Sequence, residues 1–108
     1  NPFVKLASDL SFSGFLRSAP VREGLLAVGA ASYVTTADGG ERCDLFVRLE
    51  HLEDDLRPLE AHLGFRLDLP QSNRSARPRD YRDLYTAETR ALVAEACAPD
   101  IARFGYRF

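Results

Sequence analysis

Residues 43–64 read CDLFVRLEHLEDDLRPLEAHLG, and this stretch carries the main secondary-structure signals on which the fold prediction rests. The apolar run at 45–47, bounded by a turn, indicates a short interior strand. Leu52, Leu56, Leu59 and Leu63 recur at helical spacing and form a single apolar stripe, which predicts a helix from about residue 51 to 63. A strand followed by a helix predicts a small α/β or helix-rich domain.

The ends of this helix carry signals of their own. Glu53, Asp54 and Asp55 fill its first turn, where the helix dipole favours anions, although such a cluster can also bind a cation. Gly64 follows the last leucine, as a left-handed cap would. Pro58 should bend the helix or shift its start.

Elsewhere the pattern alternates between helix and turn signals. Two short helices are expected on either side of Ser11, a weaker one over 21–31, a short strand over 32–36 and a turn at 38–40. Thr86 should cap a helix that breaks near Ala98 because Pro99 follows it. The aromatic residues at 104–108 should pack rather than fray.

Bulk properties narrow the class of protein. With 108 residues and a net charge of −2, the chain fits one small globular domain and suggests neither a nucleic-acid nor an anionic-membrane partner. It has no apolar run near the roughly 20 residues of a membrane span. Of its 14 lysine and arginine residues only Lys5 is a lysine, which indicates a GC-rich, bacterial genome and means that an anion site would be built from arginine.

Metal and redox signals are weak. Cys43 and Cys97 lie far apart, so two buried thiols are the simpler interpretation and a disulfide the alternative. His51 and His62 fit solvated surface residues better than metal ligands or proton carriers. The sequence contains no GxxxxGK, GxGxxG, HExxH or GxSxG motif, and we expect no metal.

Several ordered motifs carry a family resemblance. Arg48 to Leu56 is similar to the R-x-E-x-L-x-x-D segment of sulfotransferases that use 3′-phosphoadenosine-5′-phosphosulfate, in the bacterial and Golgi-type carbohydrate group. The family places a Cys-Asp strand before it and L-x-x-x-L-G after it. Here these are Cys43-Asp44 and residues 59–64.

The resemblance continues to the last residue. An Asn-x-Ser loop is matched by Asn73-Arg74-Ser75, and a tyrosine-rich stretch by Tyr81 and Tyr85. The family's closing D-I-x-x-F-G-Y-x-F is matched by residues 100–108.

The amino-terminal end resembles the family's R-N-P-x-x-R-x-x-S-x-Y segment, whose first Arg and whose Ser hold the donor 3′-phosphate. Residues 1–8 match from the second position onward, with Lys5 in place of the inner Arg and Leu10 in place of the Tyr. The resemblance makes Ser8 a 3′-phosphate ligand, with a hydroxyl beside the first amides of a helix. Local capping by Ser8 and a solvated Lys5 are the simpler alternatives.

A basic loop is the second candidate site. Asn73, Ser75 and Arg77, with Arg74 and Arg79 beside them, could close over the nucleotide or meet an anionic acceptor. A solvated loop explains the same residues. The catalytic base is not identified.

The resemblance implies a P-loop-kinase-like α/β fold, with residues 1–108 forming the carboxyl-terminal portion of one sulfotransferase domain. The 5′-phosphosulfate loop has no counterpart here, so we expect a longer natural chain. The intact enzyme would transfer a sulfuryl group to an acceptor hydroxyl, most simply on a carbohydrate, in a bacterial cytoplasm. The alternative is a stand-alone, non-catalytic binding or structural module. A fragment of a P-loop kinase lacks support without GxxxxGK.

Overall fold

The computed structural model describes residues 2–72, 76 and 80–108 and divides the chain into two compact units. The first unit combines Asn1–Glu41 with Pro78–Phe108, and the second is Arg42–Arg77. Each unit is described by itself. No helix in the described ranges combines the length and apolar character that crossing a membrane requires.

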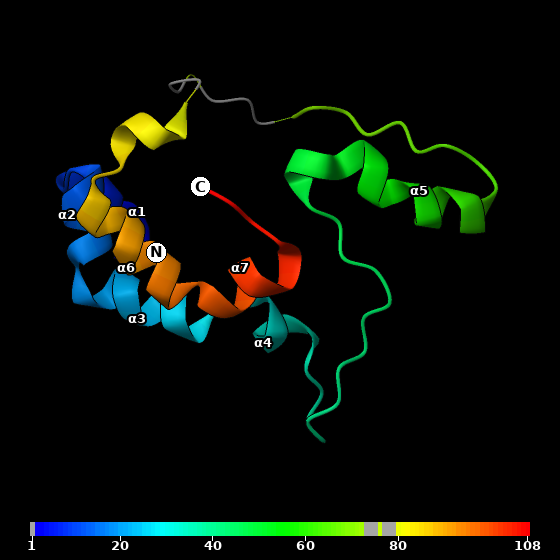
Figure 1. The fold of residues 1–108 in the computed structure, drawn as a ribbon, viewed down its shortest axis with the longest axis horizontal. Helices are drawn as coiled ribbons and strands as arrows, with labels where there is room; N and C mark the ends of the chain where they lie inside the picture. Colours follow the sequence, from blue (N-terminus) through cyan, green and yellow to red (C-terminus); the bar gives the residue numbers. More distant parts are fainter. Residues whose placement is uncertain (1, 73–75, 77–79) are drawn as a thin grey trace. The chain divides into compact units, whose positions relative to one another are not determined.

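The first unit is built from short helices that both of its segments contribute (Figure 1). They are α1 (Pro2–Asp9), α2 (Phe12–Arg17), α3 (Ala19–Ala27), α4 (Ala30–Val34), the 3-10 helix η2 (Tyr81–Leu84), α6 (Ala87–Ala96) and α7 (Ala98–Phe104). Helices α2, α3 and α6 pack on one another, so the start and the end of the chain share one core.

Capping residues explain where these helices begin. The Ser11 hydroxyl accepts a hydrogen bond from the Gly14 amide at 3.2 Å, which separates α1 from α2 as expected. Asp100 of α7 accepts from the Ala30 amide at 3.0 and 3.1 Å, so its carboxylate caps α4. The predicted break near Ala98 is confirmed, because α6 ends at Ala96 and α7 begins at Ala98.

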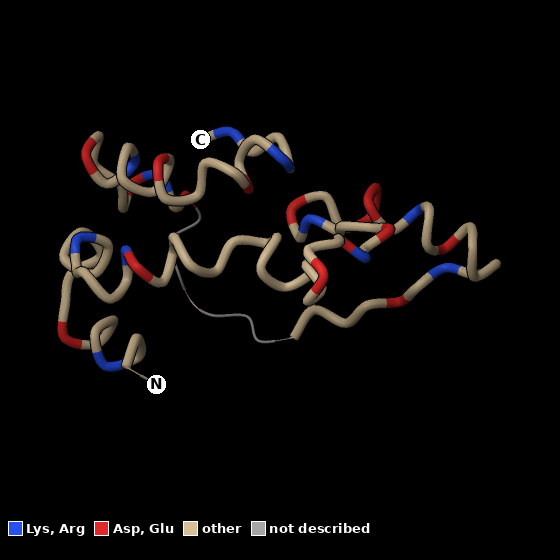
Figure 2. The backbone as a smooth tube through the Cα atoms, turned by 90° about the horizontal axis from the view of Figure 1, so that it is seen from below, with Lys and Arg blue, Asp and Glu red and all other residues tan. Residues whose placement is uncertain are grey.

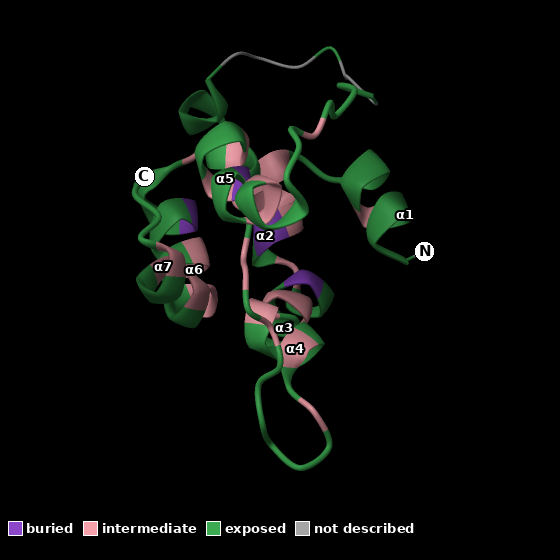
Figure 3. Cartoon of the chain, turned by 90° about the vertical axis from the view of Figure 1, so that its right-hand side faces the viewer, coloured by how far each residue is buried: buried purple, intermediate pink, exposed green. Residues whose placement is uncertain are grey.

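The buried core of the first unit is small (Figure 3). Leu16 of α2 and Val21 of α3 are its buried apolar residues within the described ranges, and Thr89 of α6 is fully buried. Arg17 and Glu88 join α2 to α6 by an ion pair at 2.6 Å, but both side chains are at least half exposed, so the pair adds little stability.

The second unit contains the 3-10 helix η1 (Leu49–His51) and α5 (Leu52–Leu63). The helix predicted from the leucine stripe is confirmed, with Leu56 buried and Pro58 inside the helix. Gly64 ends it with φ +81°, the left-handed conformation that glycine adopts without strain. The Glu60 carboxylate then accepts from the Leu67 amide at 2.8 Å, which holds the following segment against the helix.

Arg48 and Asp55 form the best-connected ion pair of this unit. The Asp55 carboxylate accepts from the Arg48 backbone amide at 2.9 Å and from its guanidinium at 2.7 and 2.8 Å. These hydrogen bonds favour the charged carboxylate and hold the Asp55 pKa well below its usual range.

We therefore expect the Asp55 carboxyl to titrate far below the ordinary value of 3.8. Because the folded-state pKa is lowered, the stability it contributes is present above the ordinary pKa and is lost as the pH falls through the lowered one. Carbon NMR of the carboxyl groups during acid titration measures this. Arg48→Ala removes the guanidinium but keeps the backbone amide bond, so it should raise the Asp55 pKa toward its ordinary value, whereas Arg57→Ala, which removes the exposed pair with Asp54, should not. An ordinary midpoint in the unaltered chain would contradict the pairing.

The α/β, P-loop-kinase-like fold predicted from the sequence is wrong for this structure. In the described part of the chain the only β pairing is the isolated bridge between Thr35 and Glu41, across the predicted turn at 38–40. Residues 30–34 form α4 where a strand was expected over 32–36. The run at 45–47 forms neither helix nor strand. A strand needs a partner strand for its amide and carbonyl groups, and the apolar run alone does not supply one.

Candidate functional site

The residues predicted to hold the donor 3′-phosphate lie on α1. Lys5 and Ser8 are three positions apart, so they are neighbours on one helix face, and both are exposed. The Ser8 hydroxyl donates to the Val4 carbonyl at 3.0 Å, a local bond within the helix. Lys5 and Ser8 are thus brought together, with the cation one turn before the hydroxyl.

Ser8 does not lie at the amino-terminal end of its own helix. Ser8 is in the last turn of α1, which ends at Asp9. The free carbonyls there carry partial negative charge, so the helix end does not favour an anion. Any phosphate affinity on this face has to come from the Ser8 hydroxyl and the Lys5 ammonium. Asn73, Ser75 and Arg77, the other predicted donor contacts, lie outside the described residues.

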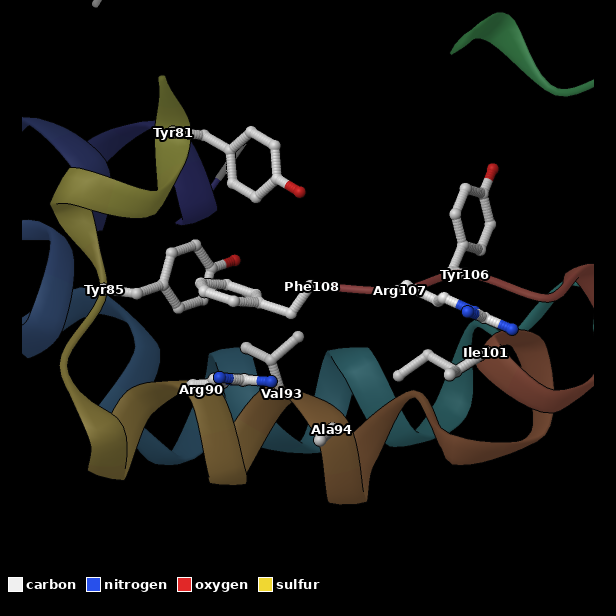
Figure 4. A pocket seen from close by; sticks show the side chains of 9 residues that line it. All are labelled: Tyr81, Tyr85, Arg90, Val93, Ala94, Ile101, Tyr106, Arg107 and Phe108. Carbon is white, nitrogen blue, oxygen red and sulfur yellow. The ribbon is translucent and has the colours of Figure 1, made fainter. Parts of the chain in front are cut away.

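The structure reveals a different site, which we call the aromatic pocket. It is a cavity of about 320 Å³ in the first unit (Figure 4). Residues from η2 and its end, from α6, and from α7 and the segment after it line the cavity: Tyr81, Tyr85, Arg90, Val93, Ala94, Ile101, Tyr106, Arg107 and Phe108. Two motif segments of the resemblance, at 81–85 and 100–108, therefore meet around one cavity.

Local turns place both segments against α6. The Asp80 carboxylate accepts from the Arg82 amide at 3.0 Å and begins η2. Thr86 and Thr89 form a capping box that begins α6. Gly105 adopts φ +68° and ends α7, where the Tyr106 amide donates to the Ile101 carbonyl at 3.2 Å. The chain then turns back, and residues 106–108 lie over α6.

The walls at one end of the pocket are aromatic. The Tyr85 ring meets Phe12 and Phe108 edge to face, with centroids 4.9 and 5.1 Å apart, and Tyr81 meets Phe108 at 5.9 Å. Such edge-to-face pairs contribute stability beyond the area that they bury. Burial also raises the pKa of the Tyr85 hydroxyl, which stays protonated at neutral pH. The expected packing of the last aromatic residues is confirmed.

The charge on the pocket is positive. Arg90 and Arg107 are its charged lining residues, and none of the lining residues is acidic. The Arg90 guanidinium lies 4.4 Å from the centre of the Phe108 ring. In the described part of the chain, basic and acidic residues are interspersed along the backbone (Figure 2), so a cavity with charges of one sign is a local feature.

Sequence reasoning missed both arginines of the pocket. From the sequence, Tyr81 and Tyr85 were predicted only as residues of a family motif, and the basic candidate site was placed at 73–79. The available signal was the position of Arg103 and Arg107 among the aromatic residues at 104–108; Arg90 had no such signal. That signal does not say which arginine faces the cavity, because this depends on the turn at Gly105.

The residues that the structure describes offer no ready metal-binding site. No group of three or more His, Cys, Asp or Glu side chains there could hold a metal ion. Cys43 and Cys97 are free thiols. Burial, and to a smaller extent Asp100, raises the pKa of the Cys97 thiol, which favours its protonated form at neutral pH.

Comparison with known proteins gave no assignment: no family model, no curated protein and no solved structure matches this chain.

Proposed function

We propose that this chain is the carboxyl-terminal part of a sulfotransferase that uses 3′-phosphoadenosine-5′-phosphosulfate. The intact protein would transfer a sulfuryl group to an acceptor hydroxyl, on a carbohydrate, in the cytoplasm. The observation that carries the proposal is the meeting of two motif segments, 81–85 and 100–108, around one cavity. A ligand site shared by the two segments would require such a meeting.

In this proposal the chain contributes to binding of the donor nucleotide. Sulfuryl transfer resembles phosphoryl transfer, in which positioned cations and hydrogen-bond donors hold the charge that develops during in-line attack. The loop that would hold the 5′-phosphosulfate has no counterpart in this sequence. Lys5 and Ser8 would contact the donor nucleotide, and turnover would belong to the intact protein.

The second candidate is a non-catalytic binding module derived from the same family. The exposed rings of the aromatic pocket favour it, because Tyr81 is 48% and Phe108 is 42% exposed and both are accessible to a ligand. This alternative needs no donor nucleotide.

Calorimetric titration of the 108-residue chain with adenosine 3′,5′-bisphosphate tests the donor role. We expect binding, weakened about tenfold by Ser8→Ala, since a hydrogen bond to a charged group is worth roughly 1.5–3 kcal/mol. Ser32→Ala is the matched control: Ser32 is also exposed, and its hydroxyl also donates to a local carbonyl, that of Gly29, at 2.7 Å. It should leave the affinity unchanged.

Three outcomes separate the candidates. Binding that is sensitive to Ser8→Ala alone supports the donor site. Binding that both serine variants leave unchanged removes Ser8 from it. No binding at all by the folded chain favours the non-catalytic module.

A further inference from the structure

The aromatic pocket has the charge of an anion site. Arg17, Arg82 and Arg103 of the first unit pair with Glu88, Asp80 and Glu41. Arg90 and Arg107 form no ion pair within the described ranges, and both are exposed. The two guanidinium groups that line the cavity therefore have no ion-pair partner within the described ranges. A planar guanidinium matches the oxygens of a phosphate or sulfate.

The two arginines differ in their surroundings (Figure 4). Arg90 lies at the aromatic end, over Phe108 and near Tyr85, so its guanidinium extends a wall of flat surfaces. Arg107 lies at the opposite end, beside Tyr106 and Ile101. Val93 and Ala94 of α6 lie between the two ends of the pocket and form a short apolar floor.

This arrangement selects the ligand by two criteria. Aromatic and guanidinium faces favour a planar ring, which stacks on them while its edge stays near the apolar floor. The unpaired Arg107 favours a negative group on that ring. A cavity of about 320 Å³ is at the lower end of the sizes that hold small molecules, so it suits one ring system with its substituent.

We propose that the aromatic pocket binds an aromatic anion, a planar ring system that carries a phosphate or sulfate group. The ring lies at the Tyr85, Phe108 and Arg90 end, and the anionic group lies on Arg107. The inference rests on the pocket alone and stands whether or not the chain is part of a sulfotransferase. Such a ligand has two sources, the adenine nucleotide of a sulfate donor or a separate aryl ester.

The test is titration of the 108-residue chain with 1-naphthyl phosphate, followed by calorimetry. We expect saturable binding that weakens at least about tenfold with Arg107→Ala and with Phe108→Ala. The neutral 1-naphthol and inorganic phosphate should each bind at least about tenfold more weakly than the intact probe. Arg90→Lys, which keeps the charge but loses the planar face, should weaken binding less than Arg90→Ala.

Matched controls come from the same unit. Arg22 and Tyr33 are exposed and do not line the pocket, so Arg22→Ala and Tyr33→Ala should leave the affinity unchanged. Far-UV circular dichroism of each variant reports whether it keeps the helical content of the unaltered chain. Among these variants, Phe108→Ala carries the greatest risk of a folding defect. Arg107→Ala alters only a surface side chain, so it tests the proposal even where Phe108→Ala fails to fold.

The outcomes are distinguishable from those of the donor experiment. Displacement of 1-naphthyl phosphate from the unaltered chain by adenosine 3′,5′-bisphosphate identifies the nucleotide as the source. Naphthyl phosphate binding that the bisphosphate does not displace identifies a separate aryl ester. Absent binding, or binding that Arg107→Ala and Arg90→Ala both leave unchanged, overturns the proposal while leaving the Ser8 result untouched.

Discussion

Leu16→Ala is expected to lower the free energy of unfolding of the first unit by about 2–3 kcal/mol, toward the lower end of the range for buried leucines. Leu16 is 6% exposed on α2, the helix that packs on both α3 and α6. A core this small supplies only about 3–5 kcal/mol in a unit of this size, so the substitution should remove most of its stability. Urea unfolding followed by far-UV circular dichroism measures the change.

The matched control is Leu26→Ala on α3. Leu26 is 65% exposed, so its truncation should change the free energy of unfolding by no more than about 0.5 kcal/mol. Equal effects of the two substitutions would show that Leu16 is not part of a cooperative core. The aromatic pocket depends on that core, because α6 supplies both its floor and the packing surface for α2.

Thr89→Val should cost about 1–3 kcal/mol, although the two side chains have nearly the same shape and similar helix propensity. Thr89 is fully buried, and its hydroxyl accepts from the Thr86 amide at 2.9 Å and donates to the Thr86 carbonyl at 3.2 Å. Valine would leave the Thr86 amide without its acceptor and open the capping box. Urea unfolding gives the total cost.

Amide hydrogen exchange localises this effect. The Arg90 amide donates to the Thr86 carbonyl at 2.9 Å in the first turn of α6, so its protection should fall more than that of residues in α3. Thr89→Ser keeps the hydroxyl and loses one methyl group, so it should retain the capping box and cost about 1 kcal/mol. A valine variant as stable as the unaltered chain would mean that the box does not hold the helix start.

Local features of the helices could be predicted from the sequence. Ser11, Thr86 and Gly64 act within one turn of their own position, so their chemistry needs no distant partner. The leucine stripe of α5 is of the same kind, since its spacing alone puts the side chains on one face. Pro58 lies inside this helix rather than at its start.

Predictions that needed a distant partner failed. The strand expected at 45–47 required a second strand to pair with, and the apolar run alone could not say whether one exists. Ser8 was expected beside the first amides of a helix, and it lies in the last turn of α1, which ends at Asp9.

The helix within residues 43–64, its cap and its charges follow from the local sequence, because these depend on spacing and on hydrogen bonds within one turn. The placement of Tyr81, Tyr85, Arg107 and Phe108 around one cavity is instead a result of tertiary packing. That meeting depends on the left-handed turn at Gly105 and on α6 lying between the two segments. No local pattern reports it, since the free energy of packing depends on which surfaces meet in space.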